Sequence, residues 1–277
     1  MKKISRRSFM AAAAVSVAAL ALTACGGSAS SAASSVASSA ASSEAASSAA
    51  AELTTVEAGK LTMATNATFP PYEMTTDSGE LEGIDVDTAK AIAEKLGLEL
   101  QIDDMDFDAA LLSVQQGKAD IVMAGVTVTD ERKAVMDFSD SYATGIQSII
   151  VPNDSDIASP DDLAGKKIGT QRGTTGYIYC SDDFGEDSVV AYDNGLTAVQ
   201  ALNNGQVDAV VIDNAPATEY VAANPGLKVL DTSYAEEDYA IGMAKGSALE
   251  DAINKALEEL KADGTLQAIV DKYINAN

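Results

Sequence analysis

An eight-residue stretch decides the fold of this protein: QQGKADIV at residues 115–122, which recurs as NNGQVDAV at residues 203–210. In each copy a helix is expected to end at the glycine, and a buried strand is expected to follow the aspartate. The pattern predicts two similar helix–strand units. Chance similarity between two units of common residue types is the alternative.

Gly125 and Asp213 occupy equivalent places, because each follows the aspartate of its copy by five residues. Both fall just beyond the carboxyl end of a predicted strand. In open α/β sheets this is the edge where loops converge on a ligand. The sequence therefore predicts two lobes, each with a ligand-binding loop.

Short apolar strands alternate with amphipathic helices from about Leu53 onward, which is typical of an α/β fold with parallel strands. Residues 60–65 predict the first strand, residues 86–96 a helix that ends at Gly97, and residues 98–102 the next strand.

Two further helices are expected near the C-terminus. Ser247 and Glu250 form a candidate capping box for the first of them, which Gly264 ends. The apolar residues expected inside the two helices are Ile253, Ala256, Leu257, Leu260, Leu266, Ile269, Val270 and Tyr273.

Residues 1–25 have the form of an export signal, with a basic start, an apolar stretch over residues 9–22 and small residues before Cys25. The apolar stretch is shorter than the roughly 20 residues of a membrane-spanning helix. LTAC at residues 22–25 resembles the bacterial lipobox, which implies a lipid on Cys25. The paired arginines leave both the general secretory and the twin-arginine export routes open.

Serine and alanine make up nearly all of residues 26–51, and such a composition buries too little apolar surface to fold. We expect a flexible tether over residues 26–58. It would hold the folded region away from the outer face of the cytoplasmic membrane, or within a periplasm. A partial helix is the alternative, because alanine favours helices.

Composition excludes several classes of function. The formal net charge is −24, and it becomes −28 without residues 1–25, so phosphate backbones are repelled and no nucleic-acid partner is expected. Histidine is absent, which removes Ser-His and Cys-His nucleophiles and the commonest zinc ligand. We expect no catalytic residues, no metal and no cofactor. Cys180 is the only cysteine besides Cys25, so no internal disulfide is expected.

The residue types after the two copies suit a zwitterion. Thr129 is expected to cap a short helix that contains Arg132, and a guanidinium beside a helix N-terminus suits a carboxylate. Asp213, after the second copy, offers a carboxylate to an ammonium group. A solvated helix residue and a helix cap are the alternative interpretations of Arg132 and Asp213.

Seven motifs occur in an order that resembles the family 3 extracellular solute-binding proteins. They are NATFPPYE (66–73), GIDVD (83–87), MDFD (105–108), TVTDER (127–132), FSDSY (138–142), DLAGKKIG (162–169) and GTT (173–175). The resemblance spans about residue 59 to the C-terminus. It implies an α/β, two-lobed periplasmic-binding-protein-like fold of type II, with crossover hinge strands near residues 147–151 and 239–244. Lobe 1 would comprise residues 59–147 and 242–277, and lobe 2 residues 148–241.

The resemblance also implies which residues bind a ligand. Arg132 takes the α-carboxylate, helped by the backbone at Gly125 and by Thr127, and Asp213 takes the α-ammonium. Thr174 and Thr175 lie on the loop that covers the carboxylate, with Gln171 as a weaker candidate.

Phe69 and Phe107 match family positions that pack against the ligand side chain, and core packing is their alternative interpretation. Asn66 departs from the aspartate of several members, which weakens the case for a basic ligand.

By this resemblance the chain is a monomeric, lipid-anchored component of an ABC importer, which captures a polar amino acid and passes it to the permease and its ATPase. Two alternatives stay open. One is an enzyme on the same fold, similar to cyclohexadienyl or arogenate dehydratase, with Glu73 or Asp213 as acid or base. The other is a ligand sensor.

Overall fold

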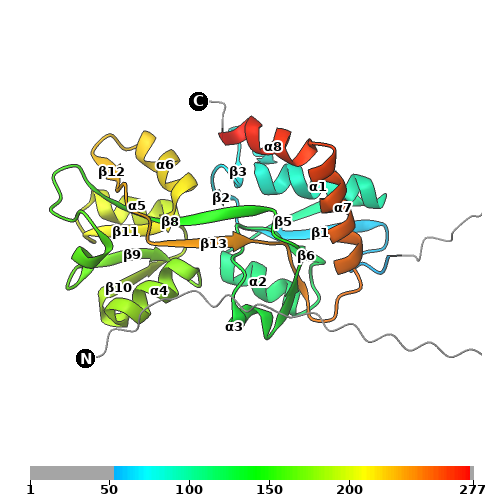
Figure 1. Cartoon of the computed structure of the whole chain (residues 1–277), viewed down its shortest axis with the longest axis horizontal. Coiled ribbons are helices and arrows are strands. Elements are labelled where there is room, and N and C mark those ends of the chain that lie inside the picture. The colour runs from blue at the N-terminus through cyan, green and yellow to red at the C-terminus, as the bar shows by residue number, and fades with distance from the viewer. Residues whose placement is uncertain (1–52, 275–277) are drawn as a thin grey trace, which may run out of the picture. The chain divides into compact units, whose positions relative to one another are not determined.

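The computed structural model describes residues 53–274, which contain two large β-sheets with helices packed on them (Figure 1). The first sheet has the order β5-β1-β6-β14-β7, formed by Glu99–Asp104, Lys60–Thr65, Ile121–Val122, Gly242–Ala244 and Met136–Phe138. Its helices are α1 (Ile84–Leu96), α2 (Phe107–Gln115), α3 (Asp130–Lys133), α7 (Glu250–Ala262) and α8 (Thr265–Ile274). A small sheet of β2 (Thr68–Phe69), β3 (Glu73–Thr75) and β4 (Leu81–Glu82) completes what we call lobe 1.

Lobe 2 is built around the second sheet, of order β10-β9-β11-β8-β12 with β13 paired to β8. These strands are Val189–Tyr192, Ile168–Gln171, Ala209–Asp213, Ala143–Pro152, Leu227–Val229 and Ala235–Tyr239. The helices of this lobe are α4 (Thr175–Phe184), α5 (Gly195–Asn203) and α6 (Asn214–Ala222), and short 3₁₀ turns lie at Pro160–Leu163 and Glu186–Ser188. Within residues 53–274 no helix is both long and apolar enough to cross a membrane.

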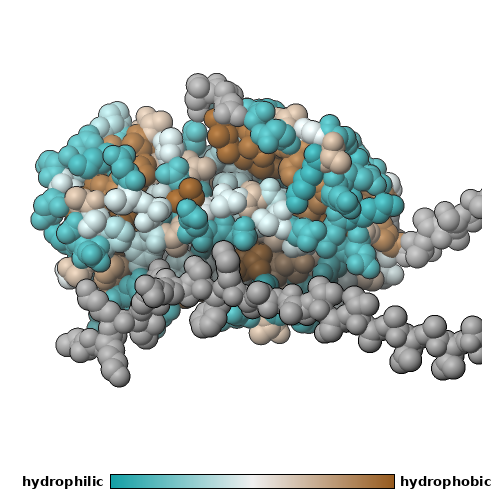
Figure 2. Space-filling view, viewed as in Figure 1, coloured by the Kyte–Doolittle hydropathy of each residue, from teal (hydrophilic) through white to brown (hydrophobic). Residues whose placement is uncertain are grey.

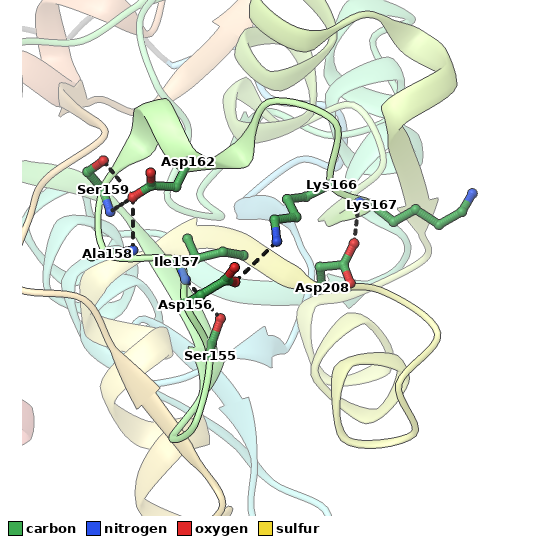
Figure 3. Close-up of polar contacts among 9 residues, drawn as sticks. All are labelled: Ser155, Asp156, Ile157, Ala158, Ser159, Asp162, Lys166, Lys167 and Asp208. Carbon is green, nitrogen blue, oxygen red and sulfur yellow. Dashed lines mark hydrogen bonds and ion pairs between the residues drawn. The ribbon is translucent and has the colours of Figure 1, made fainter.

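The two repeated stretches have the same backbone structure, as the sequence predicts. Gly117 and Gly205 end α2 and α5 in the left-handed region, with φ of 65° and 67°. The aspartate three residues after each glycine accepts a backbone N–H from a neighbouring parallel strand or from the residue just before it. Asp120 accepts the backbone N–H of Thr62 at 2.8 Å, and Asp208 accepts that of Lys167 at 2.7 Å (Figure 3).

The chain crosses between the lobes along β8 and β13, which pair antiparallel from Ala143↔Tyr239 to Gln147↔Ala235 (Figure 1). Residues 147–151, expected to act as a hinge, instead pair with β11 and β12 inside the second sheet. The crossing therefore lies before Gln147. The apolar run at residues 149–151 is buried core of lobe 2.

The other predicted elements are confirmed with small shifts in their bounds. Gly97 ends α1 with φ of 70°, and Thr129 caps α3 by accepting the N–H of Arg132. The capping box of Ser247 and Glu250 is wrong. Helix α7 starts at Glu250 itself, so Ser247 lies three residues before the helix and its hydroxyl accepts the N–H of Leu249 instead.

The first described residues, 53–58, belong to the fold although the expected tether includes them. The N–H of Val56 donates to Asp120 at 2.7 Å, and Leu53 packs on the core of lobe 1. The expected export signal, most of the tether and Cys25 lie outside the described residues. Hydrophilic residues cover much of the face drawn in Figure 2, as the acidic composition leads one to expect.

Candidate functional site

A cavity with about 450 Å³ of empty space, its opening included, lies between the two lobes. It is lined by all nine residues that the sequence assigns to ligand binding: Asn66, Phe69, Phe107, Gly125, Thr127, Arg132, Thr174, Thr175 and Asp213. The weaker candidate, Gln171, lines it too. Gly125 and Asp213 reach the cavity because Gly125 follows β6 and Asp213 ends β11, and each of these strands pairs parallel with a neighbour in its own sheet.

Arg132 enters the cavity from α3 of lobe 1 and is only 8% exposed. Its guanidinium donates to the carbonyl of Thr127 at 2.8 Å and to the carbonyl of Gly173, in lobe 2, at 3.1 Å. The guanidinium carbon lies 5.4 Å from the ring centre of Phe107. Burial lowers the pKa of Arg132, but guanidinium stays protonated in proteins, so a fixed positive charge faces the cavity.

Asp213 ends β11 of lobe 2 and is 2% exposed. One carboxylate oxygen accepts the Tyr239 hydroxyl and the N–H of Ile146, both at 2.8 Å, and the other accepts the N–H of Ala215 at 3.1 Å. Asp213 is thus both the cap of α6 and part of the cavity wall. Burial raises its pKa to about 6, although these hydrogen bonds lower it.

Hydrogen bonds join the lobes across the cavity, so the described form is closed. The Gln171 amide donates to the Asn66 oxygen at 2.9 Å, and the hydroxyls of Thr127 and Thr175 lie 3.4 Å apart. The Tyr220 hydroxyl donates to the carbonyl of Thr68. Thr174 caps α4, which directs the N-terminus of that helix at the Arg132 side of the cleft.

Aromatic rings form one wall of the cavity. Phe69 and Tyr72 stack at 5.7 Å, and the Phe69 ring lies against Gly125, where a Cβ would come within 2.8 Å of it. The N–H of Gly125 donates to Asp85 at 3.0 Å. The N–H of Gly125 is therefore already bonded to a carboxylate of the chain in the described form.

Sequence reasoning missed several residues of the site, or gave them other roles. Gln147 and Tyr239 line the cavity although they were expected only in the hinge, and Glu73 lines it although it was considered only as an enzyme's acid or base. Glu237 is buried on β13 and accepts both the Thr127 hydroxyl and the Gln147 amide at 3.0 Å. Buried and exposed residues alternate at the end of β13, which places Glu237 on the buried side. Its partners, Thr127 and Gln147, become known only from the packing of the lobes.

Gly145→Ala is expected to weaken both stability and ligand binding. A Cβ on Gly145 would lie 2.4 Å from the Tyr239 ring, so the ring must move and its hydroxyl would leave Asp213. We expect a loss of about 1–3 kcal/mol in the free energy of unfolding, measured in urea. Gly226→Ala is the matched control, because a Cβ there meets nothing within 4 Å. Equal stability of the two variants would contradict the role given to Tyr239.

Comparisons with known proteins all indicate the same family. The profile of the Bacterial extracellular solute-binding proteins, family 3, matches residues 61–276. A protein of Neisseria gonorrhoeae described as a probable histidine-binding protein is 35% identical over 271 residues, covering 95% of this chain and 94% of that relative.

Solved structures agree. The arginine-, lysine-, histidine-binding protein ArtJ of Geobacillus stearothermophilus has a TM-score of 0.75 and 34% identity, covering 79% of this chain and 96% of that one. An ancestral arginine-binding protein bound to arginine has a TM-score of 0.74 and 45% identity, with coverage of 78% and 98%. The fold is therefore the two-lobed type II fold of periplasmic amino-acid-binding proteins, as expected, and the chain belongs to the bacterial extracellular solute-binding proteins, family 3.

Proposed function

We propose that this protein is the substrate-binding component of an ABC importer, and that it captures a polar amino acid by closure of its two lobes. The observation that carries the proposal is that Arg132 of lobe 1 and Asp213 of lobe 2 line the same cavity. A guanidinium and a carboxylate on opposite walls suit the two charges of an amino acid. Closure takes both charged groups out of water and strengthens their pairing with the ligand.

The ligand side chain would meet the end of the cavity formed by Asn66, Glu73 and the aromatic wall. The carboxyl of Glu73 is fully buried and its oxygens have no donor in the described part of the chain. Such an acceptor suits a side chain that carries N–H groups. This acceptor offsets the argument against basic ligands that rests on Asn66. Arginine and glutamine, which are bound in two solved structures of an ancestral arginine-binding protein, are therefore the first candidates.

The remaining assignments are part of the same proposal. Lobe 1 comprises residues 59–147 and 242–277 and lobe 2 residues 148–241, a division that agrees with the sheets except that its first boundary falls inside β8. The protein acts as a monomer outside the cytoplasm, anchored by a lipid on Cys25, and delivers its ligand to the permease and ATPase of the importer. The arguments for the anchor are the lipobox-like LTAC and the extracellular family.

A thermal-shift screen against the common amino acids tests the function. A ligand present at 100 times its dissociation constant stabilises the folded state by about 2.7 kcal/mol, which raises the melting temperature by about 5 to 10 °C. We expect such a shift with one or a few polar amino acids. A screen in which no amino acid shifts the melting temperature would overturn the proposal.

The enzyme alternative has a separate test. The protein is expected to leave prephenate and arogenate unchanged, because the best placed acid or base groups, Glu73 and Asp213, line a cavity whose charges suit binding. Turnover that is lost in Glu73→Gln would instead favour an enzyme.

A further inference from the structure

Two buried carboxyl groups lie close together at one end of the cavity: that of Glu73, which lines the cavity, and that of Asp85. Glu73 begins β3 and Asp85 lies in the first turn of α1, and both are 0% exposed. The backbone holds the two segments together, because the N–H of Asp85 donates to the carbonyl of Tyr72 at 2.9 Å. The approach is so close that a Cβ on Gly83 would come within 2.9 Å of the Glu73 Cα atom.

The pair has no cationic partner. In the described part of the chain neither carboxylate forms an ion pair with a lysine or arginine. The Gly125 N–H donates to one oxygen of Asp85, while the other oxygen of Asp85 and both oxygens of Glu73 receive no donor from residues 53–274.

The titratable groups that face the pair are all acids. Asp104 faces Glu73 from the end of β5, and Tyr220 faces it from α6 of lobe 2. Tyr72 and Tyr142 face both carboxyls. None of these groups supplies a positive charge at neutral pH.

Two ionised carboxylates at this depth would repel each other and lack hydration, whereas one proton removes a charge and supplies the missing donor between them. Burial first, and then the neighbouring Asp85, raise the pKa of Glu73 well above its ordinary value. Burial raises the pKa of Asp85 to about 6. Because the two carboxyls interact, the proton belongs to the pair rather than to one residue.

We propose that Glu73 and Asp85 share one proton in the ligand-free protein, and that a cationic ligand side chain releases this proton to solvent while a neutral side chain leaves it in place. The inference rests on the proposed amino-acid-binding function and extends it. One carboxylic O–H bond breaks, the proton passes to the buffer, and the positive side chain takes its place as the partner of the pair.

The consequence is a single cavity that accepts side chains of different charge. With a neutral ligand the protonated pair donates and accepts hydrogen bonds without a net gain of charge. With a cationic ligand the ionised pair balances the added charge. Affinity for a cationic side chain should therefore rise with pH, by up to tenfold per pH unit below the apparent pKa of the pair, relative to a neutral ligand.

Isothermal titration calorimetry in buffers of different ionisation enthalpy counts the protons released on binding. We would titrate arginine and its neutral analogue citrulline, together with glutamine, at several pH values between about 5 and 8, so that the ligand-free pair holds its proton in part of the range. All three ligands share the same α-groups, so contributions from Asp213 and the ammonium cancel in the comparison. Arginine is expected to release about one proton more than the neutral ligands.

Glu73→Gln and Asp85→Asn each remove one member of the pair and should abolish the extra proton. Two variants are used so that a folding defect in one leaves the other to decide. Glu94→Gln, an exposed carboxylate on α1, is the matched control and should release protons like the wild type.

Three results would overturn the inference while leaving amino-acid binding intact: equal proton release by arginine and the neutral ligands, persistence of the extra proton in both variants, or binding of neutral amino acids with no binding of any cationic one. Failure of every amino acid to bind is the distinct result that overturns the proposed function itself.

Discussion

Replacing Arg132 with alanine is expected to weaken amino-acid binding by about 30-fold to several thousand-fold, which corresponds to about 2 to 5 kcal/mol. The variant leaves the ligand carboxylate in a closed cavity without its positive partner. It also removes donors from the carbonyls of Thr127 and Gly173, and the second of these contacts joins the lobes. Both losses act in the same direction, against the closed, liganded form.

Lys133→Ala is the matched control for this prediction. Lys133 is the next residue of α3 and is exposed, so its removal changes the net charge equally without opening the cavity. Calorimetric titration of both variants with the ligand from the screen measures the effect. An Arg132→Ala variant that binds as tightly as the wild type would show that the guanidinium does not hold the carboxylate.

Asp213→Asn is expected to weaken binding by a similar amount, about 30-fold or more, because an amide cannot balance the charge of a buried ammonium. Asparagine is a good helix cap, and its one amide oxygen can still accept the N–H of Ala215, so α6 should remain intact. Asp238→Asn, an exposed carboxylate on β13, is the matched control. Wild-type affinity in Asp213→Asn would contradict the assignment.

The pH dependence of binding gives Asp213 a second readout. Its pKa is raised to about 6 in the empty cavity, so the protonated form dominates below about pH 6 and cannot pair with an ammonium. Affinity for a neutral polar amino acid should rise as the pH increases through about 6 and then level off. Asp213→Asn should lose this part of the profile.

The free energy of unfolding of the ligand-free protein should fall over the pH range in which the affinity for the ligand rises. A carboxyl whose folded pKa is raised holds its proton more tightly in the folded state than in the unfolded state. The contribution of Asp213 is therefore most favourable below about pH 4, and it is lost as the pH rises through about 6. Saturating ligand should offset this loss, because it stabilises the ionised Asp213.

Much of the candidate site follows from sequence order, for a physical reason. The matched stretches at residues 115–122 and 203–210 predict two parallel strands, and parallel strands present their carboxyl ends at one edge of a sheet. Each loop therefore lies at the ligand-binding edge of its own sheet, and Gly125 and Asp213, which are 88 positions apart, line one cavity because the two lobes face each other at these edges. The glycine ends of α1, α2 and α5 follow as directly, because a left-handed residue at a helix end favours glycine.

The capping box at Ser247 and the hinge at residues 147–151 were wrong for a different reason. The capping box rested on local pattern and the hinge position on the resemblance, whereas packing decides where α7 begins and how far β8 runs into the second sheet. A β-branched apolar run suits a hinge strand and a core strand equally well. Only the pairing with β11 distinguishes them.

By itself, then, the sequence determined the α/β class, the two lobes and the residues at the strand ends, since these depend on periodicity and chain order. The tertiary structure decided the pairing of Glu73 with Asp85, the contact of Tyr239 with Asp213, and the position of the crossing strands. These features depend on side chains that are distant along the chain and meet only when the lobes pack. Burial then sets the protonation of these carboxyl groups, because the pKa of a carboxyl removed from water depends on the groups around it.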